Sequence, residues 1–448
     1  MSYFFNQLLQ QVQQKSSVKE YGFVTAIQGL LVYAQGLPTT VVGSRCLIED
    51  MHGHAHMAEV VGYRDGSALL MPFGSLEGIG PNSRVYVYQK EGHIFVNDSY
   101  LGRVVNAIAE PIDGKGALDS GGIEISLKQK PPSPGLRQRV GDKLDVGVRA
   151  MNVFVPLCKG QRMGVFAGSG VGKSVLMGMM AKFCAADIIV IGLVGERGRE
   201  VREFIDEQLG EEGLARSVVV VATGDEPPLM RRQAAYLSMS IAEYFRTQGK
   251  NVMLFMDSVT RFSFAQREIG LAVGEPPTTR GFTPSVFSEL PRLLERAGPG
   301  APGEGTITAI FTVLVEGGDM DEPVADSVRG IVDGHILLDR GLAERGHFPA
   351  IDVLKSVSRM LPGCHSPEEL EIMNQARILI SDYRDMEELI RLGAYARGSD
   401  PKIDKAIEYH DALTRFLMQK PLESATVSDA FATLGNTLVG AEVGKDER

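Results

Sequence analysis

The sequence predicts an α/β protein with three parts: an N-terminal β-barrel, a central domain with a parallel sheet, and a C-terminal helical bundle. Short β-rich runs separated by Gly, Pro, Asn and Asp fill residues 20–96. Apolar strands then alternate with helical patterns over residues 97–361, which is typical of a parallel sheet covered by helices on both faces. Residues 362–448 show only helical stripes.

Composition is consistent with an ordinary soluble protein. The 448 residues are 44% hydrophobic and 23% charged, which fits two or three domains. The net charge of −10 disfavours a protein built mainly to hold nucleic acid, although it leaves room for a local basic lining. The sequence contains no run of 18 apolar residues, so we predict no membrane span. Its N-terminus lacks the pattern of a secretory signal, and we therefore expect a cytoplasmic protein. The four cysteines lack C-x-x-C spacing, which favours reduced thiols.

Residues 1–19 have the pattern of an amphipathic helix. Its apolar stripe is formed by Phe4, Phe5, Leu8, Leu9 and Val12. The stripe has to be buried, and two interpretations remain open: it packs on its own chain, or it docks on a partner protein.

The predicted barrel contains three alternating histidines, His52, His54 and His56. On one strand face they would suit a transition metal. We favour a hairpin turn instead, because Gly53 lies between two of them and no Cys or carboxylate ligand pattern accompanies them.

A Pro-rich connection, KPPSPGLRQRV, lies within residues 97–361, and the alternation of strands and helices begins after it. In the last part, a helix start is predicted at Ser366, which is followed by Pro367 and by Glu369 at the position of a capping box. A second helix start is predicted at Asp400 and Pro401.

A phosphate-binding loop is predicted within residues 162–180, where an apolar strand breaks into glycines and continues as a helix. Gly168, Gly170 and Gly172 let the backbone curl so that successive N–H groups point into one concavity. Lys173 adds an ammonium for the β and γ phosphates, and Ser174 a hydroxyl for Mg²⁺. The strict motif begins with Gly, and this sequence has Ala167 there. The expected nucleotide contacts are Ala167, Gly168, Ser169, Gly170, Val171, Gly172, Lys173, Ser174 and Val175.

Two carboxylates follow apolar runs that are predicted strands, each at the carboxyl end of its strand. Asp257 ends NVMLFMD, and a carboxylate at that end of a strand lies where ligands bind, so we expect it to face Mg²⁺. Glu196 follows IIVIGLVG and has Arg197 and Arg199 close by. A carboxylate held near those cations can orient the water that attacks a γ-phosphate. The alternatives are a helix cap for Asp257 and a salt bridge for Glu196.

Arg359 has no informative spacing, and by itself it reads as a member of a surface ion pair.

Six motifs in order resemble one family. AGSGVGKS, VGERGREV, VMLFMDSVTRF, PSVFSELPRLLERAG, EGGDMDEPVAD and GHFPAIDVLKSVSR are similar to the type III secretion ATPases related to rotary ATPases, and most similar to their flagellum-specific branch. The resemblance covers almost the whole chain and is weakest in residues 1–19 and in the terminal AEVGKDER.

The resemblance implies a homohexamer with a RecA-like central domain that hydrolyses ATP with Mg²⁺ at subunit interfaces. It assigns Glu196 as the catalytic glutamate, Arg197 as its neighbour near the γ-phosphate, and Lys173, Ser174 and Asp257 to the phosphates and the metal. Phe348 matches the aromatic residue that packs on adenine. Arg359 matches the arginine that a neighbouring subunit supplies. Asn152 and Cys158 replace an Asp-containing pattern of the wider rotary family, which leans toward the flagellar branch.

The resemblance also implies partners and a place of action. These are a stator-like regulatory dimer bound through residues 1–19, a central stalk protein, export chaperone–substrate complexes, and indirect contact with a membrane export gate at the inner membrane; no nucleic acid is expected. The alternatives are a virulence injectisome ATPase, which would share every catalytic residue, a non-catalytic rotary-ATPase subunit, which typically lacks the carboxylate of Glu196, and a ring translocase on RNA, which the acidic net charge disfavours.

Overall fold

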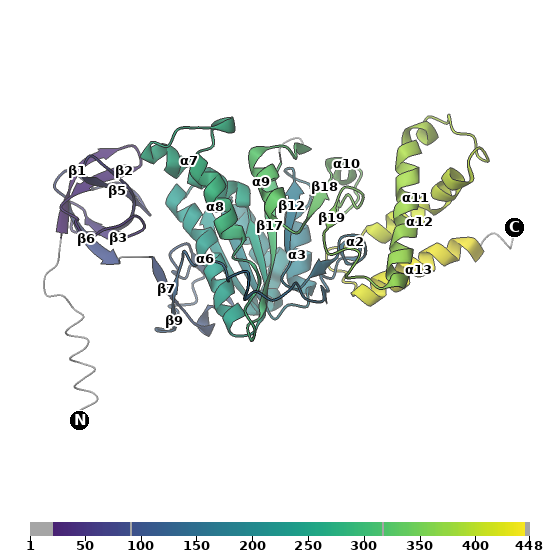
Figure 1. Cartoon of the computed structure of the whole chain (residues 1–448), viewed down its shortest axis with the longest axis horizontal. Helices are drawn as coiled ribbons and strands as arrows, with labels where there is room; N and C mark the ends of the chain where they lie inside the picture. The colour runs from purple at the N-terminus through teal and green to yellow at the C-terminus, as the bar shows by residue number, and fades with distance from the viewer. Residues whose placement is uncertain (1–20, 90–91, 316–317, 444–448) are drawn as a thin grey trace, which may run out of the picture.

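The computed structural model describes residues 21–89, 92–315 and 318–443, and the helix expected over residues 1–19 lies outside them. The described chain is elongated (Figure 1): a β-barrel lies at one end, the large sheet in the middle, and three helices at the other end. The predicted fold class is confirmed.

The barrel is closed by six strands in the order β1-β2-β5-β4-β3-β6. These are β1 (Tyr21–Gln28), β2 (Leu31–Gln35), β3 (Arg45–Glu49), β4 (Ala55–Arg64), β5 (Ser67–Pro72) and β6 (Arg84–Gln89). A small apolar core, including Cys46 and Ile48 of β3, fills the interior. The next strand, β7 (His93–Val96), falls within the range expected for the barrel but pairs with β9 (Ile123–Ser126) outside it.

The central sheet runs β19-β18-β12-β17-β15-β13-β14-β8, with β16 paired to β17. The pairings are parallel except those of β16 and β19. The strands are β8 (Arg103–Asn106), β12 (Arg162–Ala167), β13 (Ile188–Glu196), β14 (Ser217–Thr223), β15 (Asn251–Asp257), β16 (Gly298–Pro299), β17 (Thr306–Leu314), β18 (Gly334–Leu338) and β19 (Val357–Ser358). A separate two-stranded pair joins β10 (Lys143–Leu144) to β11 (Leu157–Cys158).

Both faces of the sheet are covered by helices, so alternate residues of a strand enter different cores. In β13, Val190 and Val194 join one apolar cluster, while Ile189 and Ile191 join the other. The first cluster includes α6 (Pro228–Thr247), α7 (Val259–Val273), α8 (Pro284–Leu294) and α9 (Pro323–Ile331). The second includes α2 (Arg149–Phe154), α3 (Lys173–Phe183), α4 (Gly198–Glu203) and the π-helical turn η2 (Phe204–Leu209), against which α5 (Gly210–Ala215) packs. This arrangement explains why the strands are apolar throughout.

The C-terminal part consists of α11 (Pro367–Arg391), α12 (Pro401–Leu417) and α13 (Val427–Val443). The predicted capping box at α11 is confirmed: the Ser366 hydroxyl accepts from the Glu369 N–H at 3.2 Å, and the Glu369 carboxylate accepts from the Ser366 N–H at 2.9 Å. Asp400 caps α12, as predicted, by accepting from the Lys402 N–H at 2.9 Å.

Buried polar contacts join the three parts. Arg232 of α6 donates to Glu59 of the barrel at 2.6 Å, and both side chains are buried. Where the helical part contacts the central domain, His365 Nε2 lies at hydrogen-bonding distance, 2.8 Å, from the Val153 carbonyl oxygen, and Lys143 forms an ion pair with Glu369 at 2.8 Å. Each part therefore has a defined position relative to the sheet.

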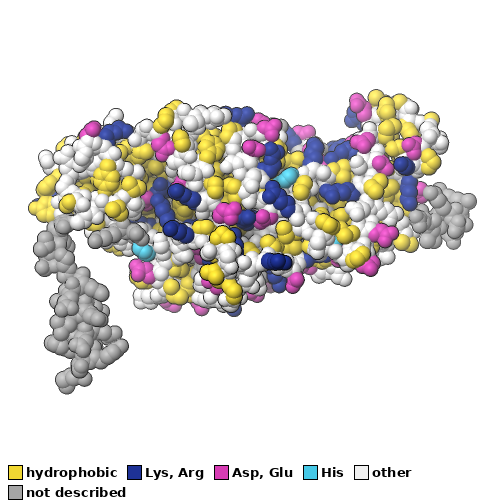
Figure 2. Space-filling model, in the orientation of Figure 1, with side chains coloured by type: hydrophobic (Ala, Val, Ile, Leu, Met, Phe, Trp, Pro, Cys, Tyr) yellow, Lys and Arg dark blue, Asp and Glu magenta, His cyan; other side chains and the backbone are white. Residues whose placement is uncertain are grey.

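The face shown in Figure 2 carries Lys, Arg, Asp and Glu interspersed among apolar and neutral side chains. Over the described residues, none of the helices combines the length and the apolar character that crossing a bilayer requires. The four cysteines are free thiols, three of them buried.

Candidate nucleotide-binding site

The loop between β12 and α3 has the geometry of an anion cradle. Gly170 and Gly172 adopt the left-handed region, with φ of 78° and 87°, where glycine is strongly favoured. Gly172 also precedes the first turn of α3, where no side chain caps the helix. The N–H groups at the start of α3 therefore remain available to an anion. Gly168, which the sequence grouped with the other two glycines, does not have a positive φ.

Lys173, at the start of α3, lies between two carboxylates. Its ammonium contacts Asp257 at the end of β15 and lies 3.5 Å from Glu196 at the end of β13. All three side chains are largely buried. β13 and β15 are parallel neighbours, so their carboxyl ends bring both carboxylates to the same edge of the sheet. The structure thus brings these predicted residues together.

Burial and charge set the protonation of this cluster. Burial raises the pKa of Glu196 to about 7, and the negative charge of Asp257 adds to the effect, with Lys173 opposing it. Burial alone would lower the pKa of Lys173, but Asp257 and Glu196 outweigh it and the pKa rises. Lys173 is therefore an ammonium at neutral pH, while Glu196 titrates near neutrality, as a general base should.

A cavity of about 870 Å³ opens above these residues and is large enough for a nucleoside triphosphate. The predicted residues that line it are Ala167, Gly168, Ser169, Gly170, Gly172, Lys173, Ser174, Val175, Glu196 and Arg197. Val171 is instead buried in the apolar core. Asp257 does not line the cavity but lies against Lys173.

The cation that contacts Glu196 differs from the one expected. Arg197 and Arg199 are both 85% exposed and pair with Glu200 at 3.1 Å and Glu203 at 2.6 Å. They point along the exposed side of α4 because Glu200 and Glu203 lie one helical turn further on. Lys173, which is distant in the sequence, takes the place beside Glu196. Arg197 remains in the cavity wall.

Two further residues belong to this site and were missed from the sequence. Arg261, near the start of α7, lines the cavity, packs on Gly195, and has a buried Nε without a hydrogen-bond partner among the described residues. Thr312 of β17 donates to the Asp257 carboxylate at 2.6 Å and fixes its orientation. Each residue has a sequence feature that could have identified it: Arg261 follows Asp257 by four residues, and Thr312 is a polar residue within the otherwise apolar run AIFTVL.

Phe348 lies beside the phosphate-binding loop. A Cβ added at Gly172 would be 3.2 Å from the Phe348 ring, so the ring covers this glycine. The side chain is 41% exposed. An exposed ring next to the loop can offer a flat apolar surface to a base.

Arg359 lies apart from this cavity. It follows β19 and lines a different hollow with Asp326 and Arg329 of α9 and with His335 of β18. The Arg359 side chain is exposed and, within the described residues, forms no hydrogen bond or ion pair; its backbone N–H donates to the Asp333 carbonyl at 3.0 Å. The surface ion pair considered from sequence is therefore absent from the described part of the chain.

The three barrel histidines do not share a strand face. His52 and His54 lie in the turn before β4, and only His56 lies in the strand. Asp50 organises the turn: its carboxylate lies 3.1 Å from His54 Nδ1 and 3.2 Å from His56 Nε2, and it accepts from the backbone N–H groups of His52 and His54. The hairpin turn favoured from sequence is confirmed.

Three family models match the chain, two of them for domains of the same family. Residues 24–87 match the beta-barrel domain of the ATP synthase alpha/beta family, residues 147–358 match the nucleotide-binding domain of that family, and residues 365–436 match the T3SS EscN ATPase C-terminal domain. Each matched range lies within one of the three structural parts, and β8 of the central sheet precedes the range of the nucleotide-binding match.

Curated relatives are similar over nearly their full length. A flagellum-specific ATP synthase from Caulobacter vibrioides is 54% identical over 96% of this chain and 98% of the relative. A flagellum-specific ATP synthase from Bacillus subtilis is 51% identical over 97% of this chain and 99% of the relative. Among solved structures, the assembled ATPase EscN from the enteropathogenic E. coli type III secretion system aligns with a TM-score of 0.87 and 42% identity, covering 93% of this chain and 100% of EscN. EscN in complex with its central stalk EscO aligns with a TM-score of 0.86 and 41% identity, covering 93% and 100%.

Proposed function

The chain belongs to the flagellum-specific branch of the ATP synthase alpha/beta family, and from this premise we propose that it is the ATPase that energises flagellar type III protein export. The observation that carries the proposal is the cluster of Lys173, Glu196 and Asp257 at the phosphate-binding loop. It combines an anion cradle with a carboxylate whose pKa suits a general base.

Each residue has a role in this proposal. The loop N–H groups and Lys173 bind the phosphates of ATP, and Phe348 packs on the adenine. Glu196 orients the attacking water and accepts its proton, while Arg197 lies in the cavity wall near the γ-phosphate. Arg261 adds a half-buried cation, whose Nε is buried, to the same cavity wall.

The residues present fit Mg²⁺. Ser174 and Asp257 offer hydroxyl and carboxylate oxygens, the hard donors that this ion prefers, directly or through coordinated water. When bound, Mg²⁺ supplies positive charge that neutralises the phosphate oxygens. Thr312 and Lys173 hold the Asp257 carboxylate in place for this purpose.

The active form is a ring, a homohexamer, with sites at subunit interfaces. The position of Arg359 supports this: it is exposed, lines a hollow separate from its own nucleotide cavity, and is without a side-chain partner among the described residues. An arginine supplied by a neighbour neutralises charge on the transferred phosphoryl group, an effect of about 10³ to 10⁵ in rate in well-studied NTPases. The solved EscN structures are of the assembled ATPase.

The remaining expectations are part of the proposal. Residues 1–19 dock a stator-like regulatory dimer, a central stalk protein enters the ring, and chaperone–substrate complexes are delivered to a membrane export gate. The protein acts in the cytoplasm, peripherally at the inner membrane. The functional division is 1–19 for docking, 20–96 for the barrel, 97–361 for ATP hydrolysis and 362–448 for the helical domain.

The first test is the rate of Mg-ATP hydrolysis in the wild type and in Glu196→Gln. We expect the substitution to lower kcat by about 10² to 10⁴ and to leave nucleotide binding in place, because it removes only the base. Glu203→Gln, an exposed carboxylate on α4 outside the cavity, is the matched control and should stay near the wild-type rate. An unchanged rate in Glu196→Gln would contradict the mechanism.

The second test concerns the biological process. The injectisome alternative shares the chemistry, so deletion of the gene has to distinguish the two. We expect loss of motility and of secreted flagellin; a strain that stays motile and loses effector delivery would instead support the injectisome assignment.

A further inference from the structure

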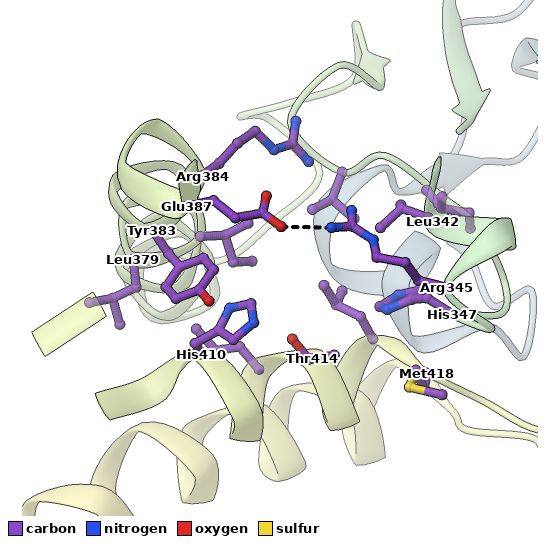
Figure 3. Close-up of a pocket in the computed structure, with 15 residues that line it drawn as sticks. Leu342, Arg345, His347, Leu379, Tyr383, Arg384, Glu387, His410, Thr414 and Met418 are labelled. Atoms are coloured by element: carbon purple, nitrogen blue, oxygen red, sulfur yellow. Dashed lines mark hydrogen bonds and ion pairs between the residues drawn. The ribbon is translucent and has the colours of Figure 1, made fainter. Parts of the chain in front are cut away.

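The segment that carries Phe348 has a cavity behind it. This segment runs from the end of α10 (Arg340–Glu344) to β19. One side of the segment carries Phe348 beside the phosphate-binding loop, and the opposite side faces α11 and α12 across a cavity of about 230 Å³. In Figure 3, Arg345 and His347 face Tyr383, His410 and Thr414 across this space. Apolar packing behind the segment is therefore incomplete, and its position depends on a few polar anchors.

One of these anchors acts on Phe348 itself. The backbone N–H of Gln419, just after α12, donates to the Phe348 carbonyl at 2.9 Å. The other anchors act elsewhere on the segment: Arg345 pairs with Glu387 at its near end, and Arg384 binds Asp352 at 2.9 and 3.1 Å.

The side chain of Gln419 fixes its own position in the central domain. The residue is 5% exposed. Its amide nitrogen donates to the carbonyls of Gly147 and Glu423, both at 2.7 Å, and its amide oxygen accepts from the Arg149 N–H at 2.9 Å. Both donors and the acceptor of this buried amide are thus satisfied.

Arg149 reinforces the same connection. Its guanidinium donates to the carbonyl of Phe416 at 3.0 Å and to that of Met418, and it pairs with Glu423. The segment after α12 is therefore held at the start of α2, and the backbone of Phe348 is tied through Gln419 to the same point.

We propose that Gln419 is a positioning residue for base recognition: by anchoring the segment after α12 and holding the Phe348 carbonyl, it keeps the Phe348 ring over Gly172, where adenine packs. The inference rests on the proposed role of Phe348 and extends it to a residue of the helical domain. The proposed effect is on binding of the adenine alone, because the phosphates are bound by the phosphate-binding loop and by Lys173.

Binding of two ligands tests this. Mg-ADP carries the adenine, and inorganic tripolyphosphate carries only phosphates. We expect Gln419→Ala to weaken Mg-ADP about tenfold, since three hydrogen bonds of a buried amide are lost, and to leave tripolyphosphate within about twofold. In hydrolysis, KM for ATP should rise while kcat changes little.

A double-mutant cycle separates positioning from a general structural role. If Gln419 acts through Phe348, the double variant Phe348→Ala, Gln419→Ala binds Mg-ADP no more weakly than Phe348→Ala alone. Gln138→Ala is the matched control, because Gln138 also donates to two backbone carbonyls, those of Ala301 and Glu304, away from the cavity. It should leave both ligands unaffected.

Equal weakening of both ligands by Gln419→Ala, or additive effects in the cycle, would overturn the proposal. Gln419→Asn, which keeps the amide but shortens the side chain, provides the same comparison if the alanine variant does not fold. The proposed function is judged separately: a wild type without ATPase activity refutes it, whereas an active wild type with unselective Gln419 variants refutes only the role of Gln419.

Discussion

At the scale of single residues, the decisive feature is that one ammonium serves two carboxylates. Lys173 contacts Asp257 and lies 3.5 Å from Glu196 in a largely buried setting. Asp257 receives a second donor, the Thr312 hydroxyl, whereas Glu196 does not share that contact. Two chemically similar groups thereby acquire different environments, which supports the different roles proposed for them.

This difference predicts a pH dependence. The pKa of Glu196 is raised to about 7, and the group acts as a base only when it has lost its proton. We expect kcat/KM for ATP to fall about tenfold per pH unit below 7 and to level off above it, since kcat/KM reports the free enzyme. The measurement is hydrolysis from pH 5.5 to 8.5 at constant ionic strength. The residual activity of Glu196→Gln should lack this step, and a flat wild-type profile would argue against Glu196 as the base.

The sequence indicated much of this site, but not all of it. The P-loop spacing identified Lys173 and Ser174, and the ends of two apolar runs identified Glu196 and Asp257. The partner of Glu196 was misjudged, because a helical turn directs Arg197 and Arg199 to carboxylates on their own helix. Thr312 was missed because its role depends on which strands are neighbours, and a linear sequence does not contain that order.

At the scale of elements, a buried ion pair joins two of the helices that cover the central sheet, α6 and, through a residue just after its end, α8. Arg296, just after α8, donates to both oxygens of Glu243 in α6 at 2.9 and 2.6 Å, and both side chains are almost fully buried. The same guanidinium donates to Ser240 and to the Leu127 carbonyl. Such a pair stabilises only as long as both members are present.

Removing one member should therefore be costly. We expect Glu243→Ala to lower the free energy of unfolding by about 3–5 kcal/mol, because the Arg296 charge stays buried without its partner. Denaturant titration of the two variants Glu243→Ala and Glu211→Ala measures this. Glu211 is exposed in α5, and its substitution should cost less than about 0.5 kcal/mol. Equal losses would show that the pair contributes nothing particular.

Element types were predictable where local rules decide them. Ser366 and Asp400 begin helices as their capping patterns predict, because a cap is satisfied by backbone N–H groups a few residues away. β7 was grouped with the barrel from its β-rich pattern, yet it pairs with β9. Strand propensity does not specify a partner, so the limit of the barrel could not be read from the chain alone.

At the scale of the whole molecule, the proposed site is divided between subunits. Lys173, Glu196 and Asp257 meet within one chain, whereas Arg359 lines a separate hollow beside α9. A ring in which each subunit presents Arg359 to the next would complete every site in the same way.

Mixing of inactive variants tests this division. Arg359→Ala keeps its own phosphate-binding loop, and Glu196→Gln keeps its Arg359. Each variant alone should retain at most about a hundredth of the wild-type rate, but an equal mixture should recover roughly a quarter of it, because random assembly joins an intact half-site to an intact Arg359 at that fraction of interfaces. The measurement is Mg-ATP hydrolysis at concentrations that assemble the ring. A mixture as inactive as its components would place Arg359 in its own subunit's site, and an Arg359→Ala variant that is active by itself would place this residue outside catalysis.

The order of strands in the sheet also has a consequence for synthesis of the chain. β17 lies between β12 and β15, although it follows both of them in the sequence. During synthesis on the ribosome, all six barrel strands are complete once Gln89 has been added. By contrast, β12, which leads into the P-loop, cannot pair fully with β17 until Leu314 has emerged. A nascent chain can thus fold its barrel early, but it acquires the ability to bind a nucleotide only late in translation.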